Sequence, residues 1–440
     1  MRRLPLATVL ATLTAALAGG WAAPRESLPP ETKADSKSNI VFIISDDHGW
    51  RDYGFMGNRA VRTPSLDALA AQSLVYRRGH VPSSLCCPSL ASIITGKYPH
   101  QHKVTSNDPP RPAGVAPGSF QRSEAFTRGR EIMSRHLEAA GTLPKLLAEH
   151  GYCSLQTGKW WQGDFRRGGF SEGMTKGGRH GDDGLDIGRK TMKPIDDFIA
   201  SAHERNQPFF LWYAPMLPHQ PHNPPERLLA KYRREGESIH IARYHAMIEW
   251  FDESVGQLME ILKKRGVDEN TMIVYVADNG WTQNPDAPGF VRSKRSPYDA
   301  GLRTPIMIRR PGKVEPGVSD RPVISIDIVP TVLHQLGIER GKDLQGVDLL
   351  DPKAVDRRGL IFGECFTHDA IDLDQPAKNL LERWVNDGRW KLIVPEATDA
   401  PVELFEIAAD PEEKSDVASK HPEVVRRLRE QLDGWWNPRD

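Results

Sequence analysis

Short apolar runs rich in β-branched and aromatic residues alternate with helical patterns along most of this chain. Four of these runs predict buried strands, at residues 40–44, 209–213, 272–276 and 305–308. Helical patterns lie between them at residues 65–73, 143–150 and 244–264. Strands that alternate with helices predict an α/β fold, in which a large, mostly parallel sheet is sandwiched between helices.

The pattern changes after about residue 354. Runs that predict shorter strands follow at 360–362, 384–385, 390–394 and 402–405. Turn residues such as Asn386-Asp387-Gly388 separate them, which is typical of a small antiparallel sheet. A helical pattern begins near Pro422, and its apolar side should pack on that sheet. We therefore predict a catalytic domain over 39–353 and a C-terminal antiparallel subdomain over 354–440.

The first 23 residues have the pattern of a signal peptide. A positive start at Met1–Arg3 precedes an apolar run that is too short to span a bilayer, and small residues follow it. The alternative is a frayed apolar N-terminus. Residues 24–38, rich in Pro, Ser and Lys, predict a linker. A secreted or periplasmic protein is the expectation, without stable membrane insertion, because no other run is long and apolar enough.

Global charge and cysteine content exclude some classes of protein. The chain has 58 basic and 58 acidic residues, so nothing indicates a nucleic acid or an anionic membrane as partner. Four cysteines do not make a disulfide scaffold in a chain of 440 residues. Cys153 and Cys365 either pair or stay buried. The adjacent Cys86 and Cys87 leave a vicinal disulfide as a remote alternative.

Two of the predicted strands end in polar pairs. Asp46 and Asp47 follow the first strand, and Asp278 and Asn279 follow the third. Adjacent carboxylates repel each other unless a cation or hydrogen bonds compensate. Carboxylate and carboxamide oxygens suit Ca²⁺ or Mg²⁺. Either pair alone is a common turn sequence, but both follow strands of one predicted sheet, so together they predict a shared metal site.

A helix with defined ends is predicted from Cys86 to Gly96. Pro88 suits its first turn, and Gly96 suits its end. Cys86 then lies at the helix N-terminus, where backbone amides and the helix dipole favour a thiolate or an anionic partner. The simpler alternative is a pair of small buried residues that precede a helix.

This helix resembles the sulfatase signature C-x-P-S-R-x-x-x-x-T-G, with Leu90 in place of the arginine. Five further segments are similar to blocks of the same family, in the same order. They are the metal pairs Asp46-Asp47 and Asp278-Asn279, the Gly158-Lys159-Trp160 block, the Pro218-His219-Gln220-Pro221 block, and Lys294 before Tyr298-Asp299-Ala300-Gly301. Asp327–Thr331 and the tail around 403–412 also resemble the family.

The resemblance implies an alkaline-phosphatase-like fold and the hydrolysis of sulfate esters, on sulfated carbohydrates or another small sulfate ester. It implies that a maturation enzyme converts Cys86 to formylglycine, the nucleophile. A metal ion would be bound by Asp46, Asp47, Asp278, Asn279 and residue 86; these ligand types suit Ca²⁺ and Mg²⁺ alike, and the resemblance favours Ca²⁺. Two lysines and one histidine complete the implied catalytic residues, with the lysines binding the sulfate and the histidine protonating the leaving group: Lys159, Lys294 and His219.

Two positions depart from the family pattern. Leu90 replaces the arginine that helps to hold the modified residue and belongs to the motif read by the maturation enzyme. Trp161 replaces a histidine that is expected to contact formylglycine. Three explanations compete: the pocket is rebuilt with another group such as His180, the chain cleaves a different ester, or it binds without turnover. The alternative functions are thus a phosphodiester or phosphonate ester hydrolase of the same superfamily and a silent carbohydrate-binding relative.

Some aromatic and polar residues could contact sugar rings, although a place in the core or in a solvated loop is an equal alternative for each. They are Trp161, Trp281, His222 and His368.

Overall fold

The computed structural model describes residues 37–439, and a nine-stranded sheet forms the centre of this region. The strand order is β4-β3-β5-β1-β6-β7-β2-β8, and β9 also pairs with β2. The strands are β1 (Asn39–Ser45), β2 (Leu74–His80), β3 (Cys153–Gly158), β4 (Glu172–Gly173), β5 (Phe209–Ala214), β6 (Thr271–Ala277), β7 (Arg303–Arg309), β8 (Gly317–Ser319) and β9 (Val323–Ile324). Only β7 runs antiparallel to its neighbours β6 and β2, which confirms a mostly parallel sheet.

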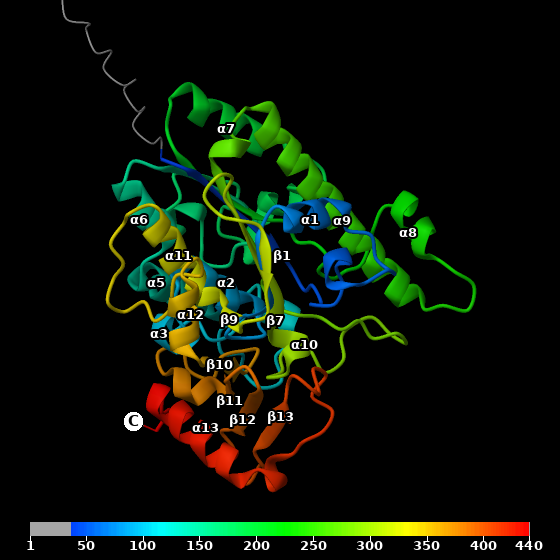
Figure 1. Cartoon of the computed structure of the whole chain (residues 1–440), viewed down its shortest axis with the longest axis vertical. Helices are drawn as coiled ribbons and strands as arrows, with labels where there is room; N and C mark the ends of the chain where they lie inside the picture. Colours follow the sequence, from blue (N-terminus) through cyan, green and yellow to red (C-terminus); the bar gives the residue numbers. More distant parts are fainter. Residues whose placement is uncertain (1–36, 440) are drawn as a thin grey trace, which may run out of the picture. The chain divides into compact units, whose positions relative to one another are not determined.

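Helices cover both faces of this sheet, as Figure 1 shows. Along β1, Ile40, Phe42 and Ile44 face one core, while Val41 and Ile43 face the other. A strand buried on both faces needs apolar residues at every position, which explains the continuous apolar run in the sequence. The first core contains residues of α2 (Cys86–Thr95), α5 (Glu124–Ala140), α6 (Leu143–Glu149), α11 (Ile328–Gln335) and α12 (Pro352–Arg358). The second contains residues of α1 (Pro64–Ala71), α7 (Lys193–Glu204) and α9 (Ile239–Lys264).

Shorter helices lie in the connections. These are α3 (Pro99–His102), α4 (Pro117–Phe120), α8 (Glu226–Tyr232) and α10 (Asp299–Leu302). The connection from β4 to α7 contains a 3-10 helix, η3 (Arg179–Asp186), whose backbone leaves the helical region at His180, Gly181 and Asp182. Among residues 37–439, no helix has both the length and the apolar character needed to cross a membrane.

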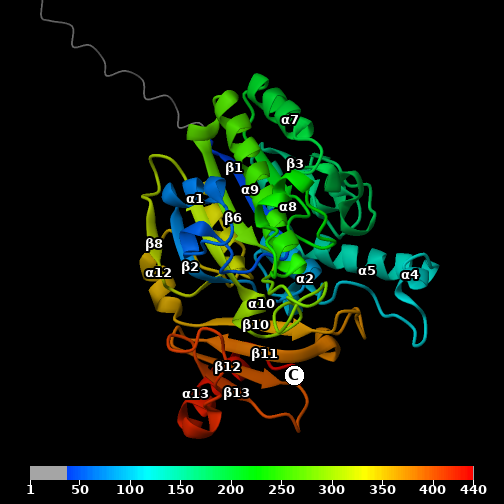
Figure 2. The same ribbon diagram turned by 90° about the vertical axis from the view of Figure 1, so that its right-hand side faces the viewer.

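The C-terminal residues form a second sheet of four antiparallel strands, drawn in orange and red in Figure 2. They are β10 (Ile361–Phe366), β11 (Leu380–Asn386), β12 (Trp390–Pro395) and β13 (Glu403–Glu406). Helix α13 (Pro422–Trp435) packs Leu428 and Leu432 against Leu392 and Leu404 of this sheet. The predicted small sheet with a covering helix is confirmed. The predicted signal peptide (1–23) and almost all of the predicted linker (24–38) lie outside the described residues.

The termini of several strands meet at one edge of the large sheet. Strands β3, β5, β1 and β6 are adjacent and parallel, so their carboxyl ends share that edge. Because β2 is antiparallel to β7 and β7 is antiparallel to β6, the end of β2 and the start of β7 lie there as well. The loops that follow β2 and precede β7 therefore reach the same place as the predicted metal residues.

Candidate active site

Both polar pairs predicted from the sequence lie at this edge. Asp46 and Asp47 directly follow β1, and Asp278 and Asn279 directly follow the adjacent strand β6. All four residues are buried. The Asp47 backbone N–H donates to Asp278 Oδ1 at 3.0 Å, and Asn279 Nδ2 donates to Asp47 Oδ1 at 2.7 Å. The two strand ends therefore form one cluster, as the sequence predicted.

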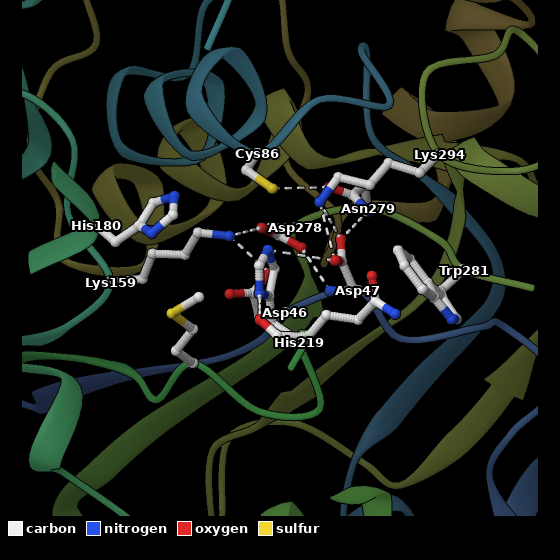
Figure 3. Close-up of polar contacts among 12 residues, drawn as sticks. Asp46, Asp47, Cys86, Lys159, His180, His219, Asp278, Asn279, Trp281 and Lys294 are labelled. Carbon is white, nitrogen blue, oxygen red and sulfur yellow. Dashed lines mark hydrogen bonds and ion pairs between the residues drawn. The ribbon is translucent and has the colours of Figure 1, made fainter. Parts of the chain in front are cut away.

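Two buried lysines contact the cluster, and Figure 3 shows them reaching it from opposite sides. Lys159 follows β3, and its Nζ donates to Asp46 Oδ1 at 2.6 Å and to Asp278 Oδ2 at 3.2 Å. Lys294 Nζ lies 2.6 and 2.9 Å from the two carboxylate oxygens of Asp47. Both lysines were predicted from the sequence, and the structure places both beside the acidic residues.

A close backbone contact positions Lys159. Gly158, the last residue of β3, has a φ of +75°, and a Cβ there would lie 2.0 Å from the Ala214 carbonyl oxygen of β5. The Lys159 N–H donates to that same oxygen at 2.7 Å. Only glycine allows the two strands to approach in this way, so the glycine of the Gly-Lys-Trp block has a structural role.

Burial and charge act in opposite directions on these groups. Burial raises the pKa of Asp46, and it raises that of Asp278 to about 7. Burial would also raise the pKa of Asp47, but the charges of Lys294, His219 and Lys159 together outweigh it and hold that pKa below its usual range. For Lys159, the neighbouring Asp278 and Asp46 outweigh burial, so its pKa lies well above the ordinary value. The two lysines thus remain cationic beside the carboxylates.

The residues present suit a divalent metal ion. Two ammonium groups face three buried carboxyl groups, and Asp46 Oδ2 is buried without a hydrogen-bond partner. A buried carboxylate oxygen without a partner is costly, and a cation that binds it would remove the cost. Atoms of Asp46, Asp47, Cys86 and His219 lie within 4.8 Å of one another. The carboxylate and carboxamide oxygens of Asp46, Asp47, Asp278 and Asn279, in the same cluster, are donors that hard cations prefer.

Cys86 is the first residue of α2, as predicted, and Gly96 ends the helix with a φ of +69°. Its Sγ lies 3.5 Å from Asn279 Oδ1, so the helix N-terminus points at the metal residues. Burial raises the pKa of the Cys86 thiol to about 12, and a plain thiol here is therefore protonated near neutral pH. All four cysteines of the chain are free and buried, so neither the Cys153–Cys365 pair nor the vicinal disulfide forms.

A cavity of about 230 Å³ opens above the cluster. Cys86, His219 and Lys294 line it, together with His180 and Trp161. His219 Nε2 lies 3.5 Å from Asp47 Oδ2, and burial lowers the pKa of this imidazole to about 3. The His180 ring centroid lies 4.5 Å from that of Trp161 and 5.9 Å from that of His219. Cys86, one lysine and two imidazoles therefore line one cavity.

The two departures from the family pattern have different structural effects. Leu90 is buried in the first hydrophobic core, so this position is a packing site in α2. Trp161 lies in the wall of the cavity, and the guanidinium groups of Arg179 and Arg130 lie 4.8 and 5.2 Å from its ring centroid. The side chain at 161 thus orders two cations where the family pattern has an imidazole.

The residues considered for sugar contact divide into two groups. Trp161, Trp281 and His368 line the cavity. His222 is not part of its lining, and its ring instead packs near Tyr244 and Trp281, with centroids 5.4 and 5.9 Å away.

Several cavity residues were not predicted from the sequence. Asn107 Oδ1 accepts a 3.0 Å hydrogen bond from the Cys87 backbone N–H. Arg179, Gln220 and Arg295 also line the cavity. Arg179 begins η3, and the other three lie in irregular loops, so none belongs to a periodic pattern. Two of them could have been suggested by the sequence, because Arg295 directly follows Lys294 and Arg179 directly precedes His180.

Comparisons with known proteins agree with this geometry. A family model described as Sulfatase matches residues 38–338, and one described as N-sulphoglucosamine sulphohydrolase, C-terminal, matches residues 290–436. N-acetylgalactosamine-6-sulfatase of Mus musculus is 27% identical, and the match covers 72% of this chain and 66% of the mouse protein, slightly less than two thirds of its length. N-acetylgalactosamine-6-O-sulfatase of Bacteroides thetaiotaomicron is 24% identical over 90% of this chain and 93% of its own.

The fold agrees too. A solved protein in complex with its substrate D-glucosamine-2-N,6-O-disulfate superposes with a TM-score of 0.71 at 19% identity, covering 91% of this chain and 98% of that chain. The expected fold class, with helices on both sides of a mostly parallel sheet and a small antiparallel sheet, is confirmed. The chain belongs to the sulfatase family.

Proposed function

We propose that this protein is an exported, metal-dependent hydrolase of sulfate esters on sulfated carbohydrates. One observation carries the proposal. The ends of two adjacent strands bring Asp46, Asp47, Asp278 and Asn279 together beneath Cys86 at a helix N-terminus. Sulfate esters carry a diffuse negative charge and a poor leaving group, so a hydrolase must surround them with cations and with hydrogen-bond donors.

In this proposal the four strand-end residues and residue 86 would hold Ca²⁺, with Mg²⁺ as the alternative. Residue 86, oxidised to formylglycine by a maturation enzyme and then hydrated, would present one of its two hydroxyls as the nucleophile, and the ion would supply Lewis-acid chemistry that favours the anionic form of that oxygen. Lys159 and Lys294 hold sulfate oxygens as point charges. His219 donates a proton to the leaving alcohol oxygen. An anionic sulfate beside His219 opposes the effect of burial on its pKa and favours the protonated form.

His180 takes part in the place of the imidazole that is absent at position 161. Its ring lies in the wall of the cavity beside Trp161 and His219. We expect His180→Ala to lower kcat by about 100-fold, the lower range for loss of an acid–base group. His203→Ala, an exposed histidine in α7, is the matched control and should match the wild type. Equal kcat in both variants would remove His180 from the proposal.

The state of residue 86 and the metal content test the proposal directly. Mass spectrometry of the peptide that carries Cys86, from protein produced in its own host, should give the mass of an aldehyde. Elemental analysis should give about one divalent ion per chain. Aryl sulfate hydrolysis should be lost in Cys86→Ala. An unmodified thiol in active protein would exclude the formylglycine mechanism, while complete inactivity with bound sugar would favour the silent relative.

A phosphodiester or phosphonate ester hydrolase is the alternative. Aryl sulfate and aryl phosphate ester substrates should be compared at equal concentration with the metal-loaded protein. A higher kcat/KM on the sulfate is expected, and a clear phosphate preference would replace the proposed function.

A further inference from the structure

A second cavity of about 250 Å³ adjoins the one above the cluster. The two share Arg179, Arg295 and His368 in their linings. A ligand with one group over Cys86 can therefore extend past these three side chains into the second cavity. We call this space the arginine cavity, defined by Arg111, Arg179, Arg295, His368, Asp108 and Asp369.

Two of its arginines already have carboxylate partners. Arg179 binds Asp108 through two bonds of 3.0 Å, and Arg111 Nε donates to Asp369 Oδ2 at 2.8 Å. His368 Nδ1 lies 2.6 Å from the other oxygen of Asp369. The two acidic residues are thus occupied by arginines, which argues against a metal site at this cluster.

The third arginine has no such partner. Among residues 37–439, no hydrogen bond or ion pair involves the guanidinium of Arg295, and its side chain is exposed between the two cavities. Three guanidinium groups face two carboxylates here. Burial lowers the pKa of His368, so this ring is neutral near pH 7 and adds no charge. The arginine cavity therefore has an unneutralised positive charge at its boundary with the catalytic cavity.

The backbone holds Arg295 in this place. Its φ is +64°, a left-handed conformation that is uncommon for arginine and costs about 1 kcal/mol or more. Its N–H donates to the Ser84 carbonyl at 3.1 Å, two residues before Cys86. The preceding residue, Lys294, reaches Asp47. This turn thus directs consecutive cations to different places, Lys294 to the metal cluster and Arg295 to the second cavity.

We propose that the arginine cavity binds a second anionic group of the substrate, so that the preferred substrate is a saccharide with at least two anionic groups. The proposal rests on the proposed function, since the first group is the sulfate ester over Cys86. A guanidinium fork binds the planar carboxylate of a uronate or the oxygens of a second sulfate equally well. Both sources share this chemistry, and the probes below distinguish them.

The test measures binding and turnover separately. Calorimetry on Cys86→Ala protein should use N-acetylgalactosamine 6-sulfate, N-acetylgalactosamine 4,6-disulfate and a hexuronate–N-acetylgalactosamine 6-sulfate disaccharide. At least one of the two dianionic probes should bind about 10- to 100-fold more tightly than the monosulfate, as a charge-assisted hydrogen bond predicts. Adding Arg295→Ala should remove this difference, and Arg295→Lys should keep part of it. The probe that gains affinity identifies a sulfate or a carboxylate as the second group.

Arg59→Ala is the matched control, because Arg59 is exposed and lines neither cavity. It should keep the full difference. Equal affinity for all three probes, no binding of any, or an unchanged preference in Arg295→Ala would overturn the proposal. When Cys86 is left intact, Arg295→Ala should raise KM for the dianionic substrate and leave kcat nearly unchanged. If the protein hydrolyses aryl sulfates but binds all three probes equally, the proposed function is supported and the second anion site is excluded. If it prefers the dianionic probes but hydrolyses no sulfate ester, the second anion site is supported and the proposed function is excluded.

Discussion

The backbone N–H of Asp47 donates a 3.0 Å hydrogen bond to Oδ1 of Asp278, and this contact joins the ends of two adjacent strands. Asp47 makes it with a φ of +60°, a left-handed conformation that is uncommon outside glycine, although asparagine and aspartate adopt it more often than other residues. The same residue accepts from Lys294 and from Asn279. Local backbone strain at Asp47 is therefore compensated by a dense set of polar contacts, which is common at functional sites.

Removal of the Lys294 ammonium group should lower activity more than it lowers the stability of the fold. Lys294→Met takes away the cation that faces both oxygens of Asp47 and, in the proposed function, a sulfate contact. We expect kcat/KM on an aryl sulfate to fall by about 100- to 1000-fold, as for loss of one preorganised donor. The control is Lys353→Met on the exposed side of α12. A rate within threefold of wild type would contradict the role of Lys294.

Gly158→Ala should destabilise the protein through a backbone clash. The added Cβ would meet the Ala214 carbonyl at 2.0 Å, and the left-handed φ of +75° adds strain. We expect a loss of about 2–5 kcal/mol in unfolding free energy. Gly114→Ala has the same kind of φ, +77°, but no atom within 4 Å of the new Cβ, so it should lose only about 1 kcal/mol. Thermal melting measures both, and equal losses would show that the contact with Ala214 is unimportant.

The pH dependence of stability should respond to Asp52. Burial raises the pKa of this carboxyl to about 7 from a usual 3.8, against the hydrogen bonds from Tyr244 and Asn58. Between these two values the folded chain binds a proton that the unfolded chain has released, so stability falls as the pH rises from about 4 to about 7. Asp52→Asn removes this contribution, and its melting temperature should fall less than that of the wild type between pH 5 and pH 8.

Asp183→Asn is the control for this experiment, because Asp183 pairs with Lys176 on the surface. It should keep the wild-type slope. A slope remains in Asp52→Asn as well, since burial also raises the pKa of Glu382 and that of Glu413 to about 7. An unchanged slope in Asp52→Asn would mean that Asp52 is ionised in the folded protein throughout this range.

Lys391 should contribute strongly to stability. This fully buried residue of β12 places its Nζ 2.8 Å from Asp299 and 2.8 Å from Glu413. Lys391→Met leaves buried carboxylates without their partner and should cost about 3–5 kcal/mol. Lys378→Met breaks a 3.0 Å pair with Asp372 at the surface and should cost less than about 1 kcal/mol. Similar melting temperatures for the two variants would show that the buried ion pairs of Lys391 contribute no more to stability than the surface pair of Lys378.

Regular elements with continuous apolar patterns were predictable from the sequence. The run at 40–44 corresponds to β1, and Pro88 and Gly96 marked α2 correctly. Strand β2 was missed because its exposed side carries Arg77, so its pattern is not continuously apolar. Helix α9 begins five residues before the predicted start at 244, because Ser238 caps it by accepting from the His240 and Ile241 N–H groups.

The cluster of Asp46, Asp47, Asp278 and Asn279 was predictable for a related reason. Parallel strands place their carboxyl ends together, so acidic pairs that follow two such strands meet without any knowledge of side-chain packing. Arg295 and Asn107 could not be located this way, because their positions depend on loops that are held by single long-range contacts. The Arg295 N–H bonds Ser84, and Asn107 accepts from Cys87. Such contacts leave no periodic trace in a sequence.

The bond between Lys391 and Asp299 has a consequence for how this protein can change. Asp299 begins α10 and lies five residues after Lys294, so a residue of the small sheet anchors the segment that carries a proposed sulfate contact. The Asp299 N–H also donates to Glu413, which lies beyond β13. The C-terminal sheet and the segment after it therefore help to position the residues that precede β7. A substitution of Lys391 or Glu413 would therefore shift the segment that carries Lys294, although neither of these two residues lines either cavity.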